Sequence, residues 1–332
     1  MSSSSPRRIP LIDVSLLKEQ DSVASREAVK IHRACRDHGF FYVVEHAIDQ
    51  DLQKALYNCS SEFFDLPLAE KREIRMELGG SAWRGYFEVG MELTSGIPDR
   101  KEGIYFGQEL GNQHPKIRDK VPMHGQNLFP SSIPSFMDVV RQYMESMTVL
   151  GHLLMRGLAL SLQLPGDFFR NHYTTDPLVL FRIFHYPPVD QDESIPMPWG
   201  VGEHTDYGVL TILKQDDVGG LQIKTKEGWI DAPYVENAFI CNIGDMLDLM
   251  TGGYYLSTPH RVQNRAQQSR YSFPFFFDPN FDSKMQPLAI PDVGRSVSPR
   301  WDGKDLQTFQ GTYGEYILDK IAKVFPDLFG TG

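Results

Sequence analysis

The sequence feature that most constrains the fold is the second half of the chain, where short apolar segments follow one another closely. After Pro165 these segments are rich in β-branched and aromatic residues, and Gly, Pro and Asp separate them. They lie at 178–186, 209–213, 221–224, 229–232, 238–243, 260–264 and 270–278. Short strands at this spacing are typical of a sandwich, jelly roll or barrel. We therefore predict an all-β core for this half.

The first half of the chain has mostly helical patterns. Apolar residues recur at intervals of three and four along 132–164, which predicts one long helix. Shorter helices are expected at 26–36, 49–64, 68–76 and 313–325, with strands at 9–14, 40–44 and 103–107. The sequence shows no internal repeat, and no linker separates the two halves. We therefore expect one composite domain, mostly β with α.

The composition narrows the function classes. Among 332 residues, 33 Lys and Arg stand against 43 Asp and Glu, a net charge of −10 that argues against nucleic acid as a partner. The longest apolar runs are far shorter than the ~20 residues of a membrane span, and the N-terminus lacks the apolar core of a secretory signal. Three scattered cysteines without a CxxC pair argue against disulfides and structural zinc. We expect a cytoplasmic monomer with no membrane partner.

One pair of residues has the spacing of a metal site. Of the ten histidines, only His204 has Asp at the second position after it, in His204-Thr-Asp206. In extended backbone both side chains project from the same face and can reach one metal ion. His260, which opens a predicted strand, is the candidate third ligand. Two imidazoles and one carboxylate form the facial triad of non-haem Fe(II) oxygenases, and the same set could bind zinc in a hydrolase.

A second pattern, Arg270-Tyr-Ser272, follows ten residues after His260. In a strand Arg270 and Ser272 share one face, whereas Tyr271, Phe273, Phe275 and Phe277 share the other. An arginine aimed into an apolar interior is costly unless an anion meets it. A guanidinium with a neighbouring hydroxyl suits a carboxylate. That carboxylate is either a ligand or a structural Asp or Glu.

These motifs carry a resemblance to a known family. His204-x-Asp206, His260-Arg-Val and Arg270-x-Ser272, with His38-Gly-Phe-Phe-Tyr and Asn242-Ile-Gly-Asp-Met-Leu, resemble the Fe(II)/2-oxoglutarate-dependent dioxygenases of the isopenicillin N synthase-like superfamily. The likeness covers nearly the whole chain. It implies an N-terminal dioxygenase region at 1–175, a double-stranded β-helix (jelly-roll) core at 176–282, and a C-terminal segment with a closing helix at 283–332.

The resemblance also implies cofactors and a reaction. His204, Asp206 and His260 would bind Fe(II), and Arg270 and Ser272 would bind the far carboxylate of 2-oxoglutarate. Tyr186 would be a further donor, although many plant members have Asn-Tyr-Tyr-Pro where this chain has Phe-His-Tyr-Pro. With O2 as co-substrate, the enzyme would oxidise an unactivated C–H bond of a small molecule, most simply to an alcohol, and release succinate and CO2.

The substrate is less constrained. We expect the pocket to draw on Tyr86, Tyr207 and either Phe275 or Phe277. Some motifs, such as Gly90-Met-Glu92-Leu-Thr94, are similar to the microbial ethylene-forming branch, which couples 2-oxoglutarate breakdown to arginine oxidation. In that branch the positions matching Glu92, Thr94, Arg182 and Tyr207 contact the amino-acid substrate or the co-substrate.

Three alternatives stay open at this point. Arg182 could contact a carboxylate or the substrate, or it could be a salt-bridged strand residue. The enzyme could form ethylene or oxidise arginine, or it could be an iron oxidase or synthase that does not use 2-oxoglutarate. A non-catalytic or zinc-binding β-barrel would be a binding module instead.

Overall fold

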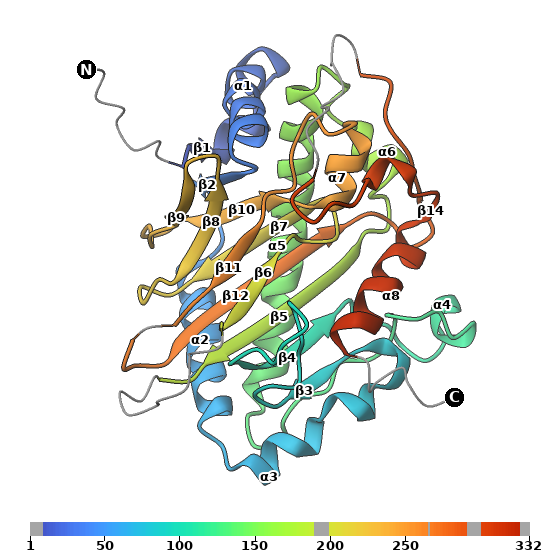
Figure 1. Ribbon diagram of the computed structural model, residues 1–332. Coiled ribbons are helices and arrows are strands. Elements are labelled where there is room, and N and C mark those ends of the chain that lie inside the picture. Colours follow the sequence, from blue (N-terminus) through green and yellow to red (C-terminus); the bar gives the residue numbers. More distant parts are fainter. Residues whose placement is uncertain (1–8, 189–198, 265, 291–299, 326–332) are drawn as a thin grey trace.

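The computed structural model describes residues 9–188, 199–264, 266–290 and 300–325, with two β-sheets at its centre (Figure 1). The larger sheet has the strand order β1 (Leu11–Asp13), β2 (Phe40–Val44), β10 (Phe239–Ile243), β7 (Leu210–Gln215), β12 (Arg270–Asp278), β5 (Leu178–Tyr186), β4 (Glu102–Gly107) and β3 (Gly85–Phe87). The smaller sheet has the order β6 (Val201–His204), β11 (His260–Val262), β8 (Leu221–Thr225) and β9 (Gly228–Asp231), and β13 (Lys284–Met285) pairs with β14 (Gly311–Thr312). The expected jelly-roll type of β core is confirmed.

Helices cover the outer face of the larger sheet. The long helix α5 (Ser135–Ser161) runs behind this sheet in Figure 1 and contacts α1 (Asp21–Asp37), α2 (Gln50–Phe64) and β12. The other helices are α3 (Leu68–Lys71), α4 (Pro115–Arg118), α6 (Phe168–His172), α7 (Asp245–Met250) and α8 (Tyr313–Val324). α8 begins at a capping box formed by Thr312 and Glu315, which satisfies backbone N–H groups at its first turn.

The two faces of β12 separate the packed core from an internal cavity. On one face, the ring of Tyr271 meets Tyr57 of α2, and the ring of Phe277 lies beside Gly151 of α5. On the other face, alternate residues beginning with Arg270 line the cavity. Because β12 pairs with both β5 and β7, its register is set on both sides. A shift of one residue would exchange the two faces.

The long elements match the sequence-based predictions better than the short ones. Strands β5 and β12 have the predicted bounds, and α5 is shorter than predicted by three residues at each end. The prediction of a helix over 68–76 is wrong, because α3 ends at Lys71 and a 3-10 turn follows. Arg75 is then extended and forms a parallel bridge with Tyr86, which a helical residue cannot do. β6 and α7 have no counterpart among the predicted elements.

Strands from distant parts of the sequence share the larger sheet. β2 lies between β1 and β10, so the N-terminal region joins the core directly. The division into three regions stays a prediction, and its outer limits at residues 1 and 332 lie outside the described residues.

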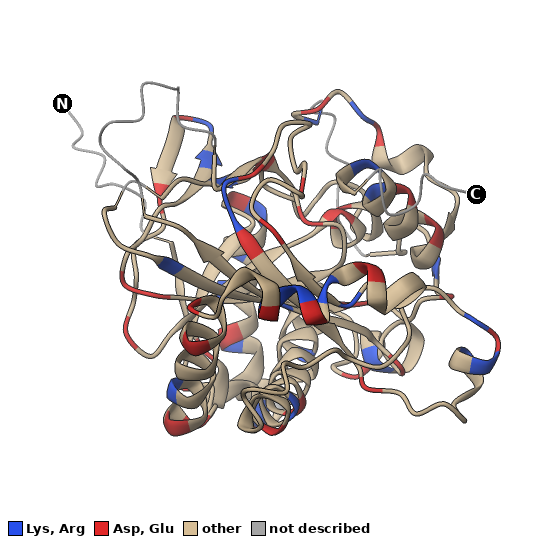
Figure 2. Ribbon diagram, turned by 90° about the horizontal axis from the view of Figure 1, so that it is seen from below, with Lys and Arg blue, Asp and Glu red and all other residues tan. Residues whose placement is uncertain are grey.

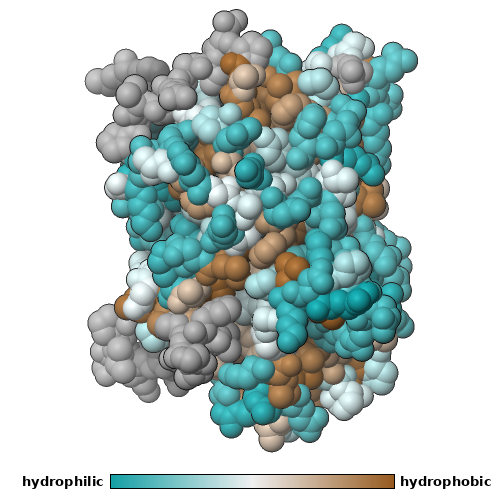
Figure 3. Space-filling view, turned by 90° about the vertical axis from the view of Figure 1, so that its right-hand side faces the viewer, coloured by the Kyte–Doolittle hydropathy of each residue, from teal (hydrophilic) through white to brown (hydrophobic). Residues whose placement is uncertain are grey.

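The surface of the described part has a mixed character. Figure 2 shows Lys and Arg interspersed with Asp and Glu along the ribbon, and Figure 3 shows apolar surface broken into patches by polar residues on one face. Among the described residues, no helix is long and apolar enough to cross a membrane.

The contact between α5 and β12 gives a stability prediction. Replacing Gly by Ala inside a helix normally stabilises it by up to ~1 kcal/mol. At Gly151, however, a Cβ would lie 2.3 Å from the buried ring of Phe277. We expect Gly151→Ala to lower the free energy of unfolding in urea by about 1–3 kcal/mol.

The matched control lies on the same helix. Val149 is 71% exposed, so Val149→Ala should change the free energy of unfolding by no more than about 0.5 kcal/mol. A Gly151→Ala protein more stable than the original chain would contradict the packing described here.

Candidate active site

The cavity between the two sheets holds most of the predicted site residues. It encloses about 870 Å³ that no atom fills, including its open mouth. Strands of both sheets line it, and α8 contributes Tyr313 and Ile317. Its polar lining comprises Glu92, Thr94, Lys101, Arg182, Tyr186, His204, Asp206, Tyr207, Thr211, Asn242, His260, Arg270, Ser272, Asp278 and Tyr313. An enclosed hollow in which polar groups converge between apolar walls is typical of a small-molecule site.

Three metal-ligand side chains converge in this cavity. His204 on β6 and His260 on β11 are directly opposite each other in the smaller sheet. Asp206 follows two residues after His204, and its Oδ1 lies 3.7 Å from the Nε2 atom of each imidazole. One ligand atom from each residue lies within 4.8 Å of the others. The three predicted ligands are therefore brought together.

Backbone carbonyls orient both imidazoles. Nδ1 of His204 lies 2.8 Å from the carbonyl oxygen of Gly202, and Nδ1 of His260 lies 3.1 Å from that of Thr258. Because a carbonyl oxygen only accepts hydrogen bonds, each Nδ1 donates its proton to the carbonyl beside it. Nε2 of each imidazole is therefore the ring nitrogen left for a metal.

The electrostatics favour a cation at this point. Burial, and then the charge of His260, lower the pKa of His204 to about 4, so this imidazole is neutral at pH 7. Burial alone would raise the pKa of Asp206, but the two imidazoles and two hydrogen bonds bring it below its ordinary value. A neutral imidazole beside an ionised carboxylate is the protonation state that binds metal. Two nitrogens and one carboxylate oxygen fit the facial triad of Fe(II).

Arg270 is a buried cation with free hydrogen-bond donors. Its side chain is fully buried and lies over the ring of Tyr186, with 4.6 Å from the guanidinium carbon to the ring centre. Nε donates to the carbonyl oxygen of Gly219, whereas Nη1 and Nη2 have no partner among the described residues. The hydroxyl groups of Tyr186 and Ser272 lie 3.2 Å apart in the same cavity. Together these groups suit an incoming carboxylate.

Arg182 stands on β5 with its guanidinium among aromatic rings. Its guanidinium carbon lies 4.7 Å from the ring centre of Trp83, 4.2 Å from that of Tyr105 and 4.8 Å from that of Phe276. Its ion-pair partner among the described residues is Glu92, with Nη1 3.8 Å from Oε1. Such a cation can still receive a carboxylate from the cavity.

Glu92 is already paired with a residue that the sequence analysis did not single out. Its Oε2 lies 2.8 Å from Nζ of Lys101, which is fully buried and lines the cavity. Burial alone would lower the pKa of Lys101, but Glu92 and Asp99 raise it, so the pair is ionised. The hydroxyl of Thr94 donates to Asp99. Glu92 and Thr94, which the resemblance places at the substrate or co-substrate, therefore have partners in the protein.

Two predicted pocket residues lie elsewhere. Phe275 faces away from the cavity and packs near Phe181, because it has the opposite strand parity to Arg270. The prediction for Phe275 is therefore wrong, and the same parity excludes Phe277. Phe276 lines the cavity instead, which counting in steps of two from Arg270 would have found.

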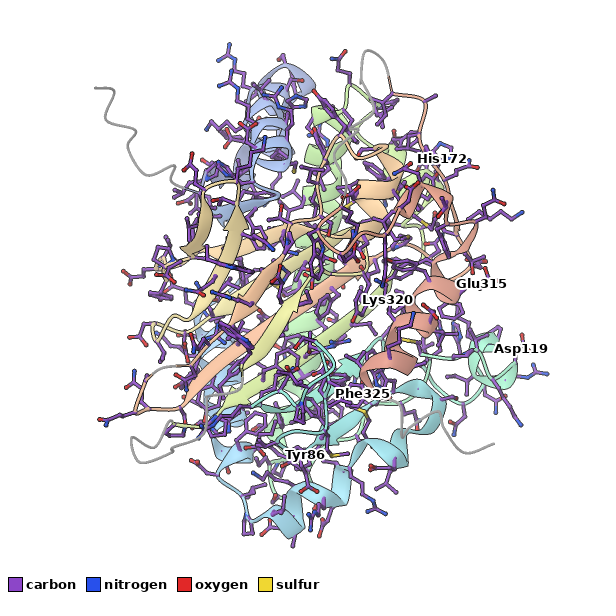
Figure 4. All side chains as sticks on the ribbon, viewed as in Figure 1. Tyr86, Asp119, His172, Glu315, Lys320 and Phe325 are labelled. Atoms are coloured by element: carbon purple, nitrogen blue, oxygen red, sulfur yellow. The ribbon has the colours of Figure 1, made fainter. Side chains whose placement is uncertain are left out.

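Tyr86 is also outside the cavity lining. It lies near the lower end of the molecule in Figure 4, and its hydroxyl donates to Glu102 at 2.5 Å. Glu102 also accepts from Lys71 at 2.9 Å and pairs with His185 at 2.8 Å. Tyr86 therefore belongs to a buried ion cluster. Tyr207 does line the cavity, with Nζ of Lys320, labelled in Figure 4, 5.2 Å from its ring centre.

Comparison with known proteins agrees with this geometry. Residues 9–132 match the family described as the non-haem dioxygenase in morphine synthesis N-terminal region, and residues 166–279 match the 2OG-Fe(II) oxygenase superfamily. The chain is 48% identical to a probable iron/ascorbate oxidoreductase of Dictyostelium discoideum, over 97% of this chain and 96% of that protein.

Two further relatives are named for amino acids, and one solved structure is also similar. A 1-aminocyclopropane-1-carboxylate oxidase of Dictyostelium mucoroides is 39% identical over 96% of both chains. A homoarginine-6-hydroxylase of Arabidopsis thaliana is 35% identical, over 96% of this chain and 98% of that protein. A Neurospora crassa protein crystallised in complex with alpha-KG has a TM-score of 0.79 and 28% identity, covering 95% of this chain and 96% of that chain.

The ion cluster around Glu102 predicts separate effects on stability and ligand binding. Tyr86→Phe removes one buried hydrogen bond to a carboxylate and should lower the free energy of unfolding by about 1.5–3 kcal/mol. Because Tyr86 lies outside the cavity, the variant should bind 2-oxoglutarate with unchanged affinity under anaerobic conditions. A weaker affinity for 2-oxoglutarate at unchanged stability would return Tyr86 to the binding site.

Proposed function

This chain belongs to the 2OG-Fe(II) oxygenase superfamily, and on that premise we propose how its residues divide the work of the reaction. It is a 2-oxoglutarate-dependent, non-haem iron dioxygenase with O2 as co-substrate. Its reaction oxidises a C–H bond of a small molecule, and we propose hydroxylation as the outcome. Nε2 of His204, Oδ1 of Asp206 and Nε2 of His260 would hold Fe(II).

Fe(II) bound there would supply the oxidation chemistry, in which 2-oxoglutarate is broken down to succinate and CO2 and a substrate C–H bond is oxidised with O2. The chain's own residues fix the ligand atoms, hold both organic molecules and exclude water. Phe184, Leu213 and Phe276 supply apolar wall for this last task.

The observation that carries the assignment of the co-substrate site is the pair of free nitrogens on Arg270. A fully buried guanidinium with unpartnered Nη1 and Nη2 is costly unless an anion completes it. The far carboxylate of 2-oxoglutarate would accept both N–H groups. Ser272 would add a hydroxyl donor, and so would Tyr186. The hydrogen bond from Nε of Arg270 to the carbonyl oxygen of Gly219 would keep the guanidinium in this orientation.

For the substrate we propose an amino acid. Arg182 would receive its carboxylate, because three aromatic rings surround the guanidinium and its carboxylate partner among the described residues is 3.8 Å away, longer than a hydrogen bond. Relatives named for homoarginine and for 1-aminocyclopropane-1-carboxylate support this class. A cationic side chain would have to share Glu92 with Lys101, and Thr94 and Tyr207 also line the cavity.

We also propose that the enzyme is a cytoplasmic monomer that binds neither nucleic acid nor membranes. The net charge of −10 and the interspersed charges support this. So do the three cysteines Cys35, Cys59 and Cys241, which are buried and free.

The two cavity arginines provide a test with an internal control. Under anaerobic conditions with Fe(II), titration with 2-oxoglutarate should give the weak visible charge-transfer band of a chelated keto acid. Arg270→Gln should raise the concentration for half-saturation about 30-fold or more, because a buried charge pair is lost. Arg182→Gln should leave it unchanged, and Asp206→Ala should abolish the band.

Two results would contradict this assignment. Equal effects of Arg270→Gln and Arg182→Gln would remove the distinction between co-substrate and substrate sites. No band in the original chain with Fe(II) demonstrably bound would favour the oxidase alternative, in which 2-oxoglutarate is not used.

The substrate class has its own test. Succinate release should rise with arginine, homoarginine or 1-aminocyclopropane-1-carboxylate as substrate. Agmatine, which is arginine without its carboxylate, should give none, and Arg182→Gln should lower the response to the active amino acid at least tenfold, since a charged hydrogen bond is worth about 1.5–3 kcal/mol. Equal turnover of agmatine and arginine would refute a carboxylate subsite at Arg182.

A further inference from the structure

The second carboxylate oxygen of Asp206 has a role that the metal ligands alone do not explain. Oδ1 faces the Nε2 atoms of His204 and His260 at 3.7 Å each. Oδ2 points the other way, toward the larger sheet. It accepts hydrogen bonds from Oγ1 of Thr211 at 2.5 Å and from Nδ2 of Asn242 at 2.6 Å.

The two donors form a matched pair on neighbouring strands. Thr211 on β7 and Asn242 on β10 are directly opposite each other in the register of the larger sheet. Both are buried, and both line the cavity. Backbone hydrogen bonds already pair these strands, so the side chains are not needed to join them. Among the described residues, the hydroxyl of Thr211 and the amide nitrogen of Asn242 bond to Asp206 alone.

Two strong donors occupy the hydrogen-bonding capacity of one carboxylate oxygen. A carboxylate oxygen has about two lone-pair sites, and here both are in use on Oδ2. Short hydrogen bonds to an ionised acceptor are strong, and removing them from a buried site is costly. Oδ1 is therefore the one carboxylate oxygen of Asp206 left for a metal.

We propose that Thr211 and Asn242 are positioning residues that restrict Asp206 to coordination through a single oxygen. This inference rests on the proposed function, in which His204, Asp206 and His260 bind Fe(II). Two nitrogens and one oxygen occupy three of the six positions of an octahedral ion, which leaves two for the keto acid and one for O2. If Asp206 used both oxygens, 2-oxoglutarate would fill the remaining positions. The donor pair thus preserves the position for O2.

The test uses nitric oxide as a probe of that position. Nitric oxide binds Fe(II) where O2 would bind and gives an electron paramagnetic resonance signal, so it requires no turnover. The full chain with Fe(II) and saturating 2-oxoglutarate is titrated with nitric oxide under anaerobic conditions. The variants are Thr211→Val, Asn242→Leu and their combination, which remove the donors at nearly constant volume. Thr211→Ser keeps the hydroxyl and serves as the control.

The inference predicts a selective loss. The double variant should keep the visible band of bound 2-oxoglutarate but bind nitric oxide about tenfold or more weakly, which is a usual size for effects of residues behind metal ligands. Without 2-oxoglutarate, the double variant should bind nitric oxide as tightly as the original chain, because the positions that the keto acid would occupy on Fe(II) are then open. Each single variant should bind nitric oxide with an affinity between those of the original chain and the double variant. Thr211→Ser should bind it as tightly as the original chain.

Other outcomes overturn the inference. Nitric oxide binding by the double variant at the original affinity, with 2-oxoglutarate bound, would show that the donors do not control coordination. Loss of Fe(II) binding in the single variants would assign the donors to retention of the metal instead. Absence of the 2-oxoglutarate band in the original chain would overturn the proposed function itself, and this separates the two failures.

Discussion

The site depends on one buried carboxylate, Asp206, that connects the two sheets. Asp206 follows β6 of the smaller sheet in sequence, and the larger sheet holds it through Thr211 and Asn242. His204 and His260 come from the smaller sheet alone. An ionised carboxylate in such a place must be paired or hydrogen-bonded, because burial opposes its charge. The hydrogen bonds that satisfy Asp206 therefore also link the end of β6 to β7 and β10 beside the candidate metal site.

A second buried charge, that of Arg270, lies in the same cavity. Arg270 lies on β12 beside Tyr186 of β5, its direct neighbour in the register. The protein satisfies Nε and leaves Nη1 and Nη2 for a ligand. Arg182, four residues before Tyr186 on β5, is surrounded by aromatic rings instead. Two cations of one type in one cavity thus differ in what surrounds them, and from this difference we propose Arg270 for the co-substrate and Arg182 for the substrate.

Strand parity explains how much of the site the sequence could predict. The spacing of Arg270 and Ser272 places both on one face of β12 without knowledge of the fold. His204 and Asp206 also converge, although Asp206 lies beyond the end of β6. The same rule places Phe276 in the cavity and Phe275 outside it. The prediction of Phe275 as a pocket residue was wrong because it did not follow this rule. Tyr86 and Lys101 could not be placed this way. Their positions depend on contacts with the carboxylates of Glu102 and Glu92, which strand parity does not predict. The short helix at 68–71 likewise ends because Arg75 pairs with a strand that local periodicity does not reveal.

We propose that this cavity holds a metal at His204, Asp206 and His260 and an anion at Arg270. A crystal structure of the full chain grown without O2, with redox-inert Mn(II) and 2-oxoglutarate, tests both parts together. We predict the metal on both Nε2 atoms and on Oδ1 of Asp206, with the far carboxylate of the keto acid against Nη1 and Nη2 of Arg270. Metal bound through other residues, or a carboxylate seated on Arg182 with Arg270 left bare, would contradict the account.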